Sequence, residues 1–290
     1  MKDKIVVFGG SGFLGSHVCD ELITSGYEVT IFDYQESNYK PHEAKFIKGD
    51  ILNYDDVYEA IVNSKYVFNF AGLADIDQAK NHPIETVKLN VLGNVNILEA
   101  CKECKVERFI FASTVYVYSS SGSFYRASKQ SAEKYIETYH ERYGLNYTIM
   151  RYGSLYGRRA DERNAIYRFI KQALDQNKIV YNGNPDGLRE YIHVKDASRL
   201  SVKILEKNYE NKHFILTGTE KMTFRNLLNM ISEILNNNVN IVFKNDSNLK
   251  SHYTMTPYSY SPSIGEKLVS NQFIDMGQGI LDCISEYKQN

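Results

Sequence analysis

Short apolar runs alternate with amphipathic stretches through the first half of the chain. Five of these runs are rich in Val, Ile, Phe and Tyr and lack polar alternation, at 4–8, 28–32, 66–70, 108–112 and 147–151. Strands that are buried on both faces of a parallel sheet have this composition. Helical stretches lie between the runs, at 12–25, 54–63, 83–104 and 125–143. This alternation predicts an α/β fold with a doubly wound parallel sheet, the Rossmann arrangement.

After residue 151 the alternation of apolar runs and amphipathic stretches becomes less regular. We expect helices near 161–176, 195–207, 223–235 and 275–287, and short strands near 179–181 and 214–217. The polar segment 244–263 carries Tyr253 and predicts a long loop that is either functional or simply mobile. The sequence therefore predicts two interleaved domains. The first covers 1–155 and is completed by part of 189–217, and the second is a smaller C-terminal α/β domain over 156–290.

Composition and charge narrow the class of protein. The 290 residues carry 34 Lys and Arg against 35 Asp and Glu, a formal net charge of −1. That balance provides no broad basic surface for nucleic acid or for an acidic membrane. No apolar run reaches the roughly 18 residues that span a bilayer, and the N-terminus has no secretory pattern. We therefore expect no nucleic-acid partner, no membrane partner and a cytoplasmic location.

The cysteines agree with a reducing compartment. Cys101 and Cys104 have the spacing of a metal or redox pair, but they lie in a predicted helix. The chain has no second cysteine pair and no histidine at zinc spacing. We interpret both residues as ordinary helix thiols and expect no metal site.

A glycine-rich turn follows the first predicted strand and opens a helix. Gly9, Gly12 and Gly15 stand in this turn, with Phe13 and Leu14 between the last two. Glycines let the backbone come close to a pyrophosphate, whose charge then meets the amides at the positive end of the helix. The strand before the turn and the helix after it raise the motif above chance. The sequence therefore predicts a dinucleotide site here.

Asp33 sets the identity of the dinucleotide. It ends the second predicted strand, about 20 residues beyond the glycines, where a carboxylate can accept both hydroxyls of an adenosine ribose and repels a 2′-phosphate. Tyr34 and Gln35 follow and provide no cation for that phosphate. The pattern favours NAD over NADP. Asp50, after the run 46–48, is either an adenine neighbour or the capping residue of the next helix.

Tyr125 and Lys129 are the candidate acid/base pair. They lie four apart on a predicted helix, so they share one face about a turn from each other. The ammonium lowers the pKa of the phenol because a nearby positive charge favours the phenolate. Such a tyrosine can take a proton from an alcohol while hydride leaves the same carbon. The pair belongs to an inward stripe of residues 125, 129, 132, 136, 139 and 143, and we expect Glu133, Glu137 and Glu141 to face solvent.

With these residues assembled, the chain resembles a known family over nearly its whole length. It is similar to the extended short-chain dehydrogenases/reductases, the NAD-dependent epimerase/dehydratase family that acts on nucleotide sugars. The segments that carry the resemblance are FGGSGFLG (8–15), GDI (49–51), AGL (71–73), NVLGN (90–94), FAST (111–114), RYGSLYG (151–157) and REYIHVKD (189–196). Together they are highly specific for the family and much less specific for the reaction.

The resemblance implies roles for named residues. Thr114, Tyr125 and Lys129 would be catalytic, with Thr114 bonded to the sugar hydroxyl that is oxidised. The implied NAD-binding residues are Gly9, Gly12, Phe13, Leu14, Gly15, Asp33, Asp50, Ile51, Ala71, Gly72, Leu73, Asn90, Tyr125 and Lys129. The implied substrate-binding residues are Thr114, Tyr116, Ser154, Arg189 and Tyr253. For Arg189, a surface ion pair with a neighbouring acid is the alternative.

The resemblance also implies a reaction and a partner. We expect NAD-dependent oxidoreduction at the sugar 4-position, by a 4-dehydrogenase or 4-epimerase that serves surface polysaccharide precursor synthesis. The alternatives are a reductase of 4-keto nucleotide sugars and a non-catalytic NAD-binding sensor. The substrate would be a nucleotide-diphosphate sugar, bound by the C-terminal domain. The family pairs subunits through two long helices, so we expect a homodimer through 83–104 and 125–143.

Departures from the family pattern bear on the reaction. Family dehydratases carry an Asp-Glu pair directly after the active-site Thr, whereas Val115 and Tyr116 stand there in this chain. Neither can act as a carboxylate acid or base, which argues against a 4,6-dehydratase. The connection between Thr114 and Tyr125 is also shorter than is usual in the family, and Ser154 replaces an Asn.

Overall fold

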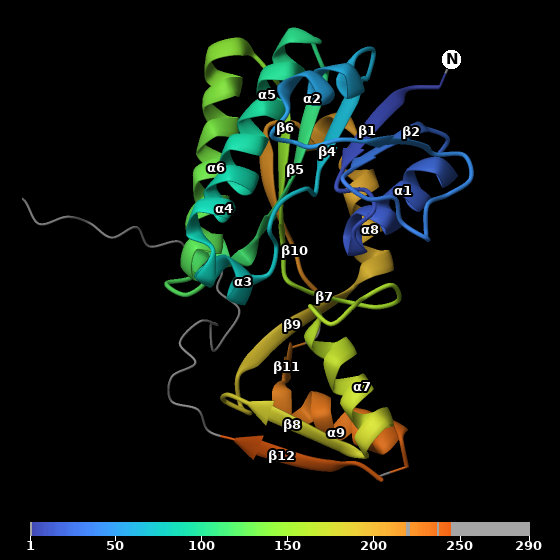
Figure 1. Ribbon diagram of the computed structural model, residues 1–290, viewed down its shortest axis with the longest axis vertical. Helices are drawn as coiled ribbons and strands as arrows, with labels where there is room; N and C mark the ends of the chain where they lie inside the picture. Colours follow the sequence, from blue (N-terminus) through green and yellow to red (C-terminus); the bar gives the residue numbers. More distant parts are fainter. Residues whose placement is uncertain (1, 219–220, 237, 245–290) are drawn as a thin grey trace, which may run out of the picture. The chain divides into compact units, whose positions relative to one another are not determined.

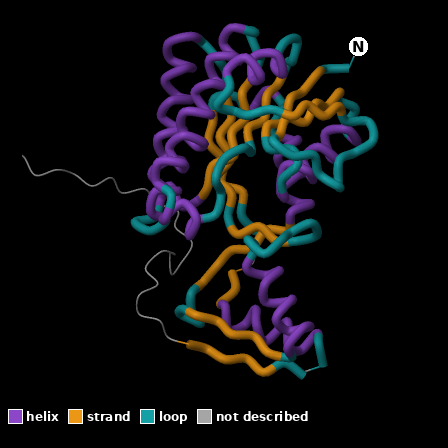
Figure 2. The backbone as a smooth tube through the Cα atoms, viewed as in Figure 1, coloured by secondary structure: helices purple, strands orange, loops and turns teal. Residues whose placement is uncertain are grey.

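A seven-stranded parallel sheet organises the larger part of the chain (Figures 1 and 2). The computed structural model describes residues 2–218, 221–236 and 238–244. The order of strands across the sheet is β10-β6-β5-β4-β1-β2-β3. Their bounds are β1 Lys4–Phe8, β2 Glu28–Asp33, β3 Lys45–Lys48, β4 Tyr66–Asn69, β5 Arg108–Thr114, β6 Tyr147–Tyr152 and β10 Lys212–Leu216. The predicted Rossmann arrangement is confirmed.

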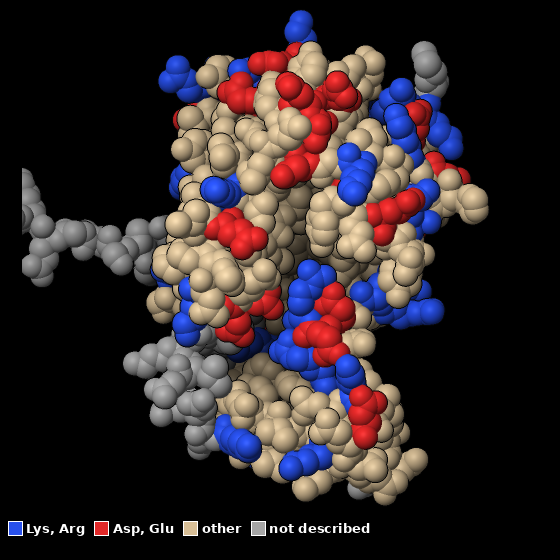
Figure 3. All heavy atoms as spheres, viewed as in Figure 1, with Lys and Arg blue, Asp and Glu red and all other residues tan. Residues whose placement is uncertain are grey.

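Helices cover both faces of this sheet because alternate strand residues point to opposite sides. Val6 and Phe8 face a core that also contains side chains of α2 (Tyr54–Ile61), α5 (Gly93–Glu103) and α6 (Ser123–Tyr143). Ile5 and Val7 face a second core, shared with α1 (Phe13–Thr24) and α8 (Val194–Lys203). The charges on the visible face are mixed in sign, without one broad basic area (Figure 3).

The helical stretch predicted over 83–104 is not one regular helix. It runs as α4 (Pro83–Val87), a π-helical turn (Lys88–Leu92) and α5. A π turn inserts an extra residue into the helical path and is frequent at functional sites. Before it, α3 (Ile76–Asn81) forms a short helix that the sequence did not predict. The predicted helical stretch is confirmed in its extent, and the π turn within it was not predicted because no local sequence pattern indicates one.

The remaining described strands form two small sheets. β7 (Ser154–Tyr156) and β11 (Lys221–Thr223) flank β9 (Leu188–His193), and β8 (Lys178–Asn182) pairs with β12 (Asn240–Lys244). α7 (Ala165–Gln176) and α9 (Phe224–Ile234) pack on β8 and β12 around their own core. The domain boundary at residue 155 stays a prediction. Tyr253, the helix predicted at 275–287 and most of the loop predicted over 244–263 lie outside the described residues.

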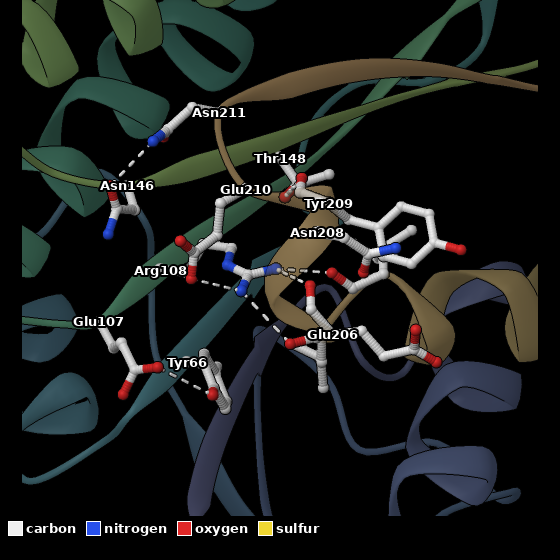
Figure 4. A network of polar contacts seen from close by, with 12 residues as sticks. Tyr66, Glu107, Arg108, Asn146, Thr148, Glu206, Asn208, Tyr209, Glu210 and Asn211 are labelled. Carbon is white, nitrogen blue, oxygen red and sulfur yellow. Dashed lines mark hydrogen bonds and ion pairs between the residues drawn. The ribbon is translucent and has the colours of Figure 1, made fainter.

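Arg108 ties the late part of the chain to the sheet (Figure 4). It begins β5 and is only 1% exposed. Its guanidinium donates to the carbonyl oxygens of Ile204 (2.6 Å), Glu206 (3.2 Å) and Leu205 (3.3 Å), directly after α8. It also donates to a carboxylate oxygen of Glu210 at 2.7 Å. A cation there satisfies carbonyls that a helix end leaves free and complements the negative end of the helix dipole.

The described part of the chain bears on the expectations for a membrane span and for a metal site. None of its helices has the length and apolar character to cross a bilayer. Nor do its residues contain a group of three or more His, Cys, Asp or Glu that could hold a metal ion. Cys101 and Cys104 are free, and burial raises the pKa of both thiols.

Candidate active site

A cavity of about 1400 Å³ lies at the carboxyl ends of β1, β2, β4, β5 and β6. Ligands of doubly wound sheets bind at this end of the strands. Most of the site residues predicted from the sequence line it: Gly9, Gly12, Phe13, Leu14, Gly15, Asp33, Asp50, Ile51, Ala71, Gly72, Thr114, Tyr116, Tyr125, Lys129, Ser154 and Arg189. Residues as far apart as the first strand and β9 thus meet at one cavity.

The first turn needs glycines because a Cβ atom would not fit at two of its positions. Gly9 has a φ of +74°, and a Cβ there would lie 2.6 Å from the backbone nitrogen of Ala71. A Cβ on Gly15 would lie 2.2 Å from the carbonyl oxygen of Gly9. Gly12 is the N-cap residue of α1, whose first residues line the cavity. The positive end of this helix therefore faces the space where a pyrophosphate would lie.

Asp33 is held in the cavity wall by the backbone of the glycine turn. One carboxylate oxygen accepts from the Ser11 amide at 3.0 Å and the other from the Tyr34 amide at 2.8 Å. Burial raises the pKa of Asp33, and the bonds from Ser11, Tyr34 and Gln35 act in the opposite direction. The segment that follows lines the cavity with Tyr34 and Gln35 and brings no cation there. These residues fit the ribose of NAD.

Asp50 does not cap the helix that follows it. Asn53 is the N-cap of α2 and accepts from the Asp55 amide. Asp50 accepts from the Leu52 amide at 2.9 Å, is exposed and lines the cavity beside Ile51. The capping alternative is therefore wrong, and a place near the adenine stays a prediction.

Leu73 and Asn90 lie behind the cavity wall. The Asn90 side chain accepts from the Leu73 amide at 2.7 Å and donates to the Leu73 carbonyl oxygen at 3.0 Å. It also donates to Ser128 Oγ at 2.9 Å, and Ser128 donates to the carbonyl oxygen of Tyr125 at 2.8 Å. Asn90 therefore joins the segment after β4 to the start of α6. This contact places it as a support of the site and not on its surface.

Thr114, Tyr125 and Lys129 converge on the cavity. Thr114 ends β5, whereas Tyr125 and Lys129 lie on the inward face of α6 and are 9% and 6% exposed. The Lys129 ammonium donates to the Ala112 carbonyl oxygen at 2.8 Å and lies 6.0 Å from the centroid of the Tyr125 ring. Tyr116 meets Tyr125 edge to face, with ring centroids 6.3 Å apart. The acid/base candidate Tyr125, the Lys129 ammonium and the Thr114 hydroxyl therefore lie at the same cavity.

The short connection before Tyr125 folds tightly. Val115–Tyr118 form a 3-10 turn, and Gly122 caps α6 with a φ of +102°. A Cβ at Gly122 would lie 2.7 Å from the Tyr116 ring. Glycine is needed there because the conformation is left-handed and the ring is close. This turn carries Tyr116 into the cavity wall beside Tyr125.

Burial of the Lys129 ammonium reduces the stability of the fold. Burial lowers its pKa to about 8, and the carboxylate of Glu133 acts in the opposite direction. Between that value and the ordinary pKa of about 10.4, the unfolded chain binds the extra proton. Folding stability therefore rises with pH across this window, and the charged ammonium weakens the fold below it.

We expect Lys129→Met to lose activity and to raise the free energy of unfolding at pH 7 by about 1–3 kcal/mol. Glu133 keeps its other cation, so the substitution leaves no unpaired charge. Urea unfolding at pH 7 and pH 10 measures the effect, and the gain is smaller at pH 10. A variant less stable than the wild-type protein at pH 7 would contradict this expectation.

The prediction for the acidic face of α6 was wrong at one position. Glu133 is 5% exposed, whereas Glu141 is exposed as predicted and Glu137 is half-buried. Both oxygens of Glu133 bond to Arg151 of β6. The sequence carried one signal, an arginine within an otherwise apolar strand, because a buried guanidinium needs a buried acid.

The substrate side of the cavity includes Ser154 and Arg189. Arg189 is 6% exposed, so the alternative of a surface ion pair is wrong. Its guanidinium lies 5.2 Å from the centroid of the Phe224 ring and donates to the Leu188 carbonyl oxygen at 3.1 Å. A buried guanidinium at a cavity wall is suited to phosphate oxygens.

Known proteins are similar to this chain in sequence and in fold. The model of the NAD dependent epimerase/dehydratase family matches residues 5–217. A relative from Methanocaldococcus jannaschii that bears the name "Putative UDP-glucose 4-epimerase" is 31% identical over 246 residues, 77% of this chain and 79% of that protein. The UDP-glucose 4-epimerase of Thermotoga maritima, solved with UDP-glucose, has a TM-score of 0.81 at 27% identity and covers 89% of this chain and 90% of its own.

A second solved structure has a similar fold. The UDP-N-acetylglucosamine 4-epimerase of Methanobrevibacter ruminantium, in complex with UDP-N-acetylmuramic acid, has a TM-score of 0.80 at 28% identity, covering 90% of this chain and 91% of its own. The family match and the Rossmann sheet lead to one conclusion. The chain belongs to the NAD-dependent epimerase/dehydratase family, whose members are enzymes that act with NAD on nucleotide sugars.

Proposed function

We propose that this enzyme is a 4-epimerase of a nucleotide-diphosphate sugar. In this reaction the 4-hydroxyl is oxidised, and hydride then returns to the opposite face of the ring. The observation that carries the proposal is that Thr114, Tyr125 and Lys129 line the same cavity as Asp33 and the glycine turn. A net 4-dehydrogenase, which releases the keto sugar, uses the same residues and is the second candidate.

The residues suggest how the proton moves. Thr114 Oγ1 holds the sugar 4-oxygen, and Tyr125 takes its proton as hydride leaves C4. NAD, when bound, supplies the hydride acceptor. The Lys129 ammonium beside Tyr125 favours the phenolate that receives the proton. In the return step Tyr125 gives the proton back to the 4-keto oxygen, so atoms and charge balance over the cycle.

The neighbouring side chains favour this reaction over dehydration. Val115 is buried and Tyr116 contributes a ring to the wall, so the two positions after Thr114 provide no carboxylate. Loss of water from the sugar needs an acid or base beyond the one that Tyr125 supplies. Arg189 supports binding of the diphosphate, because a guanidinium pairs with two phosphate oxygens at once.

The test is to incubate the enzyme with UDP-glucose or UDP-N-acetylglucosamine and NAD, and to follow sugar and NADH together by NMR and absorbance. A 4-epimer without net NADH supports the epimerase. Keto sugar with one NADH per turnover identifies the dehydrogenase instead. In a parallel incubation, conversion of a 4-keto nucleotide sugar with consumption of NADH, without conversion of the two alcohol sugars, identifies a reductase. No conversion of any of these substrates identifies a sensor and refutes the proposal.

We also propose a homodimer formed through 83–104 and 125–143. α4 and α5 follow one another along one helical path, both pack beside α6 (Figure 1), and α4 and α6 carry exposed apolar side chains. Ile84 is 73% exposed, Val87 53% and Tyr143 51%. Such a surface is stabilised by a second copy of itself. We expect a solution mass of twice 33.4 kDa by light scattering, and a shift toward monomer in Val87→Lys. A monomeric wild-type protein would refute the dimer.

The compartment is a further proposal. The free thiols Cys19, Cys101 and Cys104 suit the reducing cytoplasm. Cell fractionation with an antibody to the protein tests this location, and recovery outside the cytoplasmic fraction would exclude it.

A further inference from the structure

A buried ion pair lies next to the catalytic candidates. Glu133 on α6 and Arg151 on β6 bond through both carboxylate oxygens, with Nε–Oε1 at 3.0 Å and Nη2–Oε2 at 2.7 Å. The Glu133 residue is 5% exposed, and the Arg151 side chain is 16% exposed. A fork-to-carboxylate pair of this kind fixes both orientation and distance. The two elements are therefore held at a defined separation behind the cavity.

The same carboxylate holds the end of β5. Ser113 Oγ donates to Glu133 Oε1 at 2.5 Å, and Ser113 is the direct neighbour of Arg151 across the β5–β6 pairing. Ser113 precedes Thr114, whose hydroxyl is assigned to the substrate. One turn earlier on α6, Lys129 bonds to the Ala112 carbonyl oxygen. Two successive residues of β5 are thus bonded to two successive turns of α6.

Arg151 extends the network to the turn after Thr114. Its third guanidinium nitrogen bonds to the hydroxyl of Tyr118, and its guanidinium carbon lies 4.8 Å from the centroid of that ring. Tyr118 ends the 3-10 turn that begins at Val115. The segment that carries Thr114 is therefore anchored by the ion pair both before and after it.

We propose that Glu133 and Arg151 are positioning residues of the active site. Their ion pair fixes Ser113 and Tyr118, and with them Thr114, against the helix that carries Tyr125. It also places a carboxylate one helical turn behind the Lys129 ammonium. The inference rests on the proposed function, because it assigns these residues to support the same proton transfer.

The charges around Glu133 come from three elements. α6 contributes Lys129 and Glu137, β6 contributes Arg151, and β10 contributes His213. The charge of Glu133 favours the protonated form of Lys129 and opposes the effect of burial on its pKa. Removing that charge therefore moves the titration of Lys129 to lower pH. This effect separates a positioning role from a merely structural one.

The experiment compares Glu133→Gln with Glu137→Gln, a matched control one turn further along α6. Glu137 pairs with Lys134 and His213 and does not line the cavity. For Glu133→Gln we expect kcat to fall about 10- to 100-fold with little change in KM, because the reacting groups lose their alignment. The control keeps the wild-type kcat within about twofold.

The second readout needs no substrate. The Lys129 resonance in protein labelled with ¹³C at lysine Cε, assigned by its loss in Lys129→Met, reports the titration directly. We expect it to move down by about one pH unit in Glu133→Gln and to stay unchanged in Glu137→Gln. If the wild-type enzyme converts none of the sugars, the proposed function fails while this titration still tests the inference.

Ser113→Ala keeps the test available if Glu133→Gln does not fold. It removes a small hydroxyl that bonds to Glu133 and leaves the ion pair in place. We expect kcat to fall about threefold to tenfold with unchanged KM. Wild-type kcat in Ser113→Ala, or an unmoved Lys129 titration in a folded Glu133→Gln, would overturn the proposal.

Discussion

Tyr125→Phe is expected to lower kcat about 10²- to 10⁴-fold while NAD and nucleotide sugar still bind. The substitution removes only the hydroxyl to which we assign the proton exchange with the sugar 4-oxygen. The ring stays in place, where it is 9% exposed and packs against Leu73 and Ala79. Steady-state turnover and the Kd for NAD, measured on the same preparation, separate the loss of chemistry from a loss of binding.

Tyr139→Phe is the matched control on the same helix. Tyr139 also lies on the inward stripe of α6, but its hydroxyl donates to Glu99 at 2.6 Å, away from the cavity. We expect this variant to keep kcat within about twofold and to lose about 1 kcal/mol of stability. Equal turnover in Tyr125→Phe and the wild-type enzyme would remove Tyr125 from the mechanism.

Arg108→Met is expected to cost about 3–5 kcal/mol of unfolding free energy. The guanidinium satisfies three carbonyl oxygens after α8 and pairs with Glu210, as Figure 4 shows. A methionine fills the space but donates nothing, so the carbonyl oxygens of the buried residues Ile204 and Leu205 lose this donor. Urea unfolding followed by circular dichroism measures the loss.

Glu210→Gln separates the ion pair from the carbonyl contacts. The Glu210 side chain is 22% exposed, and its replacement leaves the bonds from Arg108 to the backbone in place. We expect a loss of about 1 kcal/mol. If both variants lose the same amount, the carbonyl contacts contribute nothing and the interpretation of Arg108 is wrong.

The strands of the large sheet were predictable because both of their faces are buried. β1, β2, β4, β5 and β6 begin at the residues where the apolar runs begin. Strands that are buried on both faces are near-continuous apolar runs, so they can be predicted without knowing which strand they pair with. The edge strand β10 was found only in part for the opposite reason, since His213 and Lys212 interrupt its apolar pattern.

Of the small sheets only β8 was predicted, near 179–181; their other strands escaped prediction because they are short or carry charged residues. β9 carries Arg189 and Glu190, both 6% exposed, in place of the apolar residues that a buried strand usually has. Their surroundings are supplied by β11 and α9, which come later in the chain. Sequence patterns cannot show a charge that is buried by distant elements, and such charges are frequent where a protein binds a ligand.

In the active site, too, the sequence predicts local features but not contacts between distant elements. The spacing of Tyr125 and Lys129 and the glycine turn are local, so the sequence could propose them, and the structure brings them to one cavity. Glu133 could not be placed, because helix period and charge alone put it with the solvent-facing acids. Its partner Arg151 comes from the next strand, and only the fold reveals their contact.

The position of β10 has a consequence for synthesis on the ribosome. β6 ends at Tyr152, but the strand that covers its free edge spans Lys212–Leu216. The carbonyls that Arg108 binds also emerge only after residue 203. A nascent chain thus presents an open strand edge and an unsatisfied guanidinium until this part is made. We expect chaperones to engage the chain in that interval, and fragments that stop before residue 212 to aggregate.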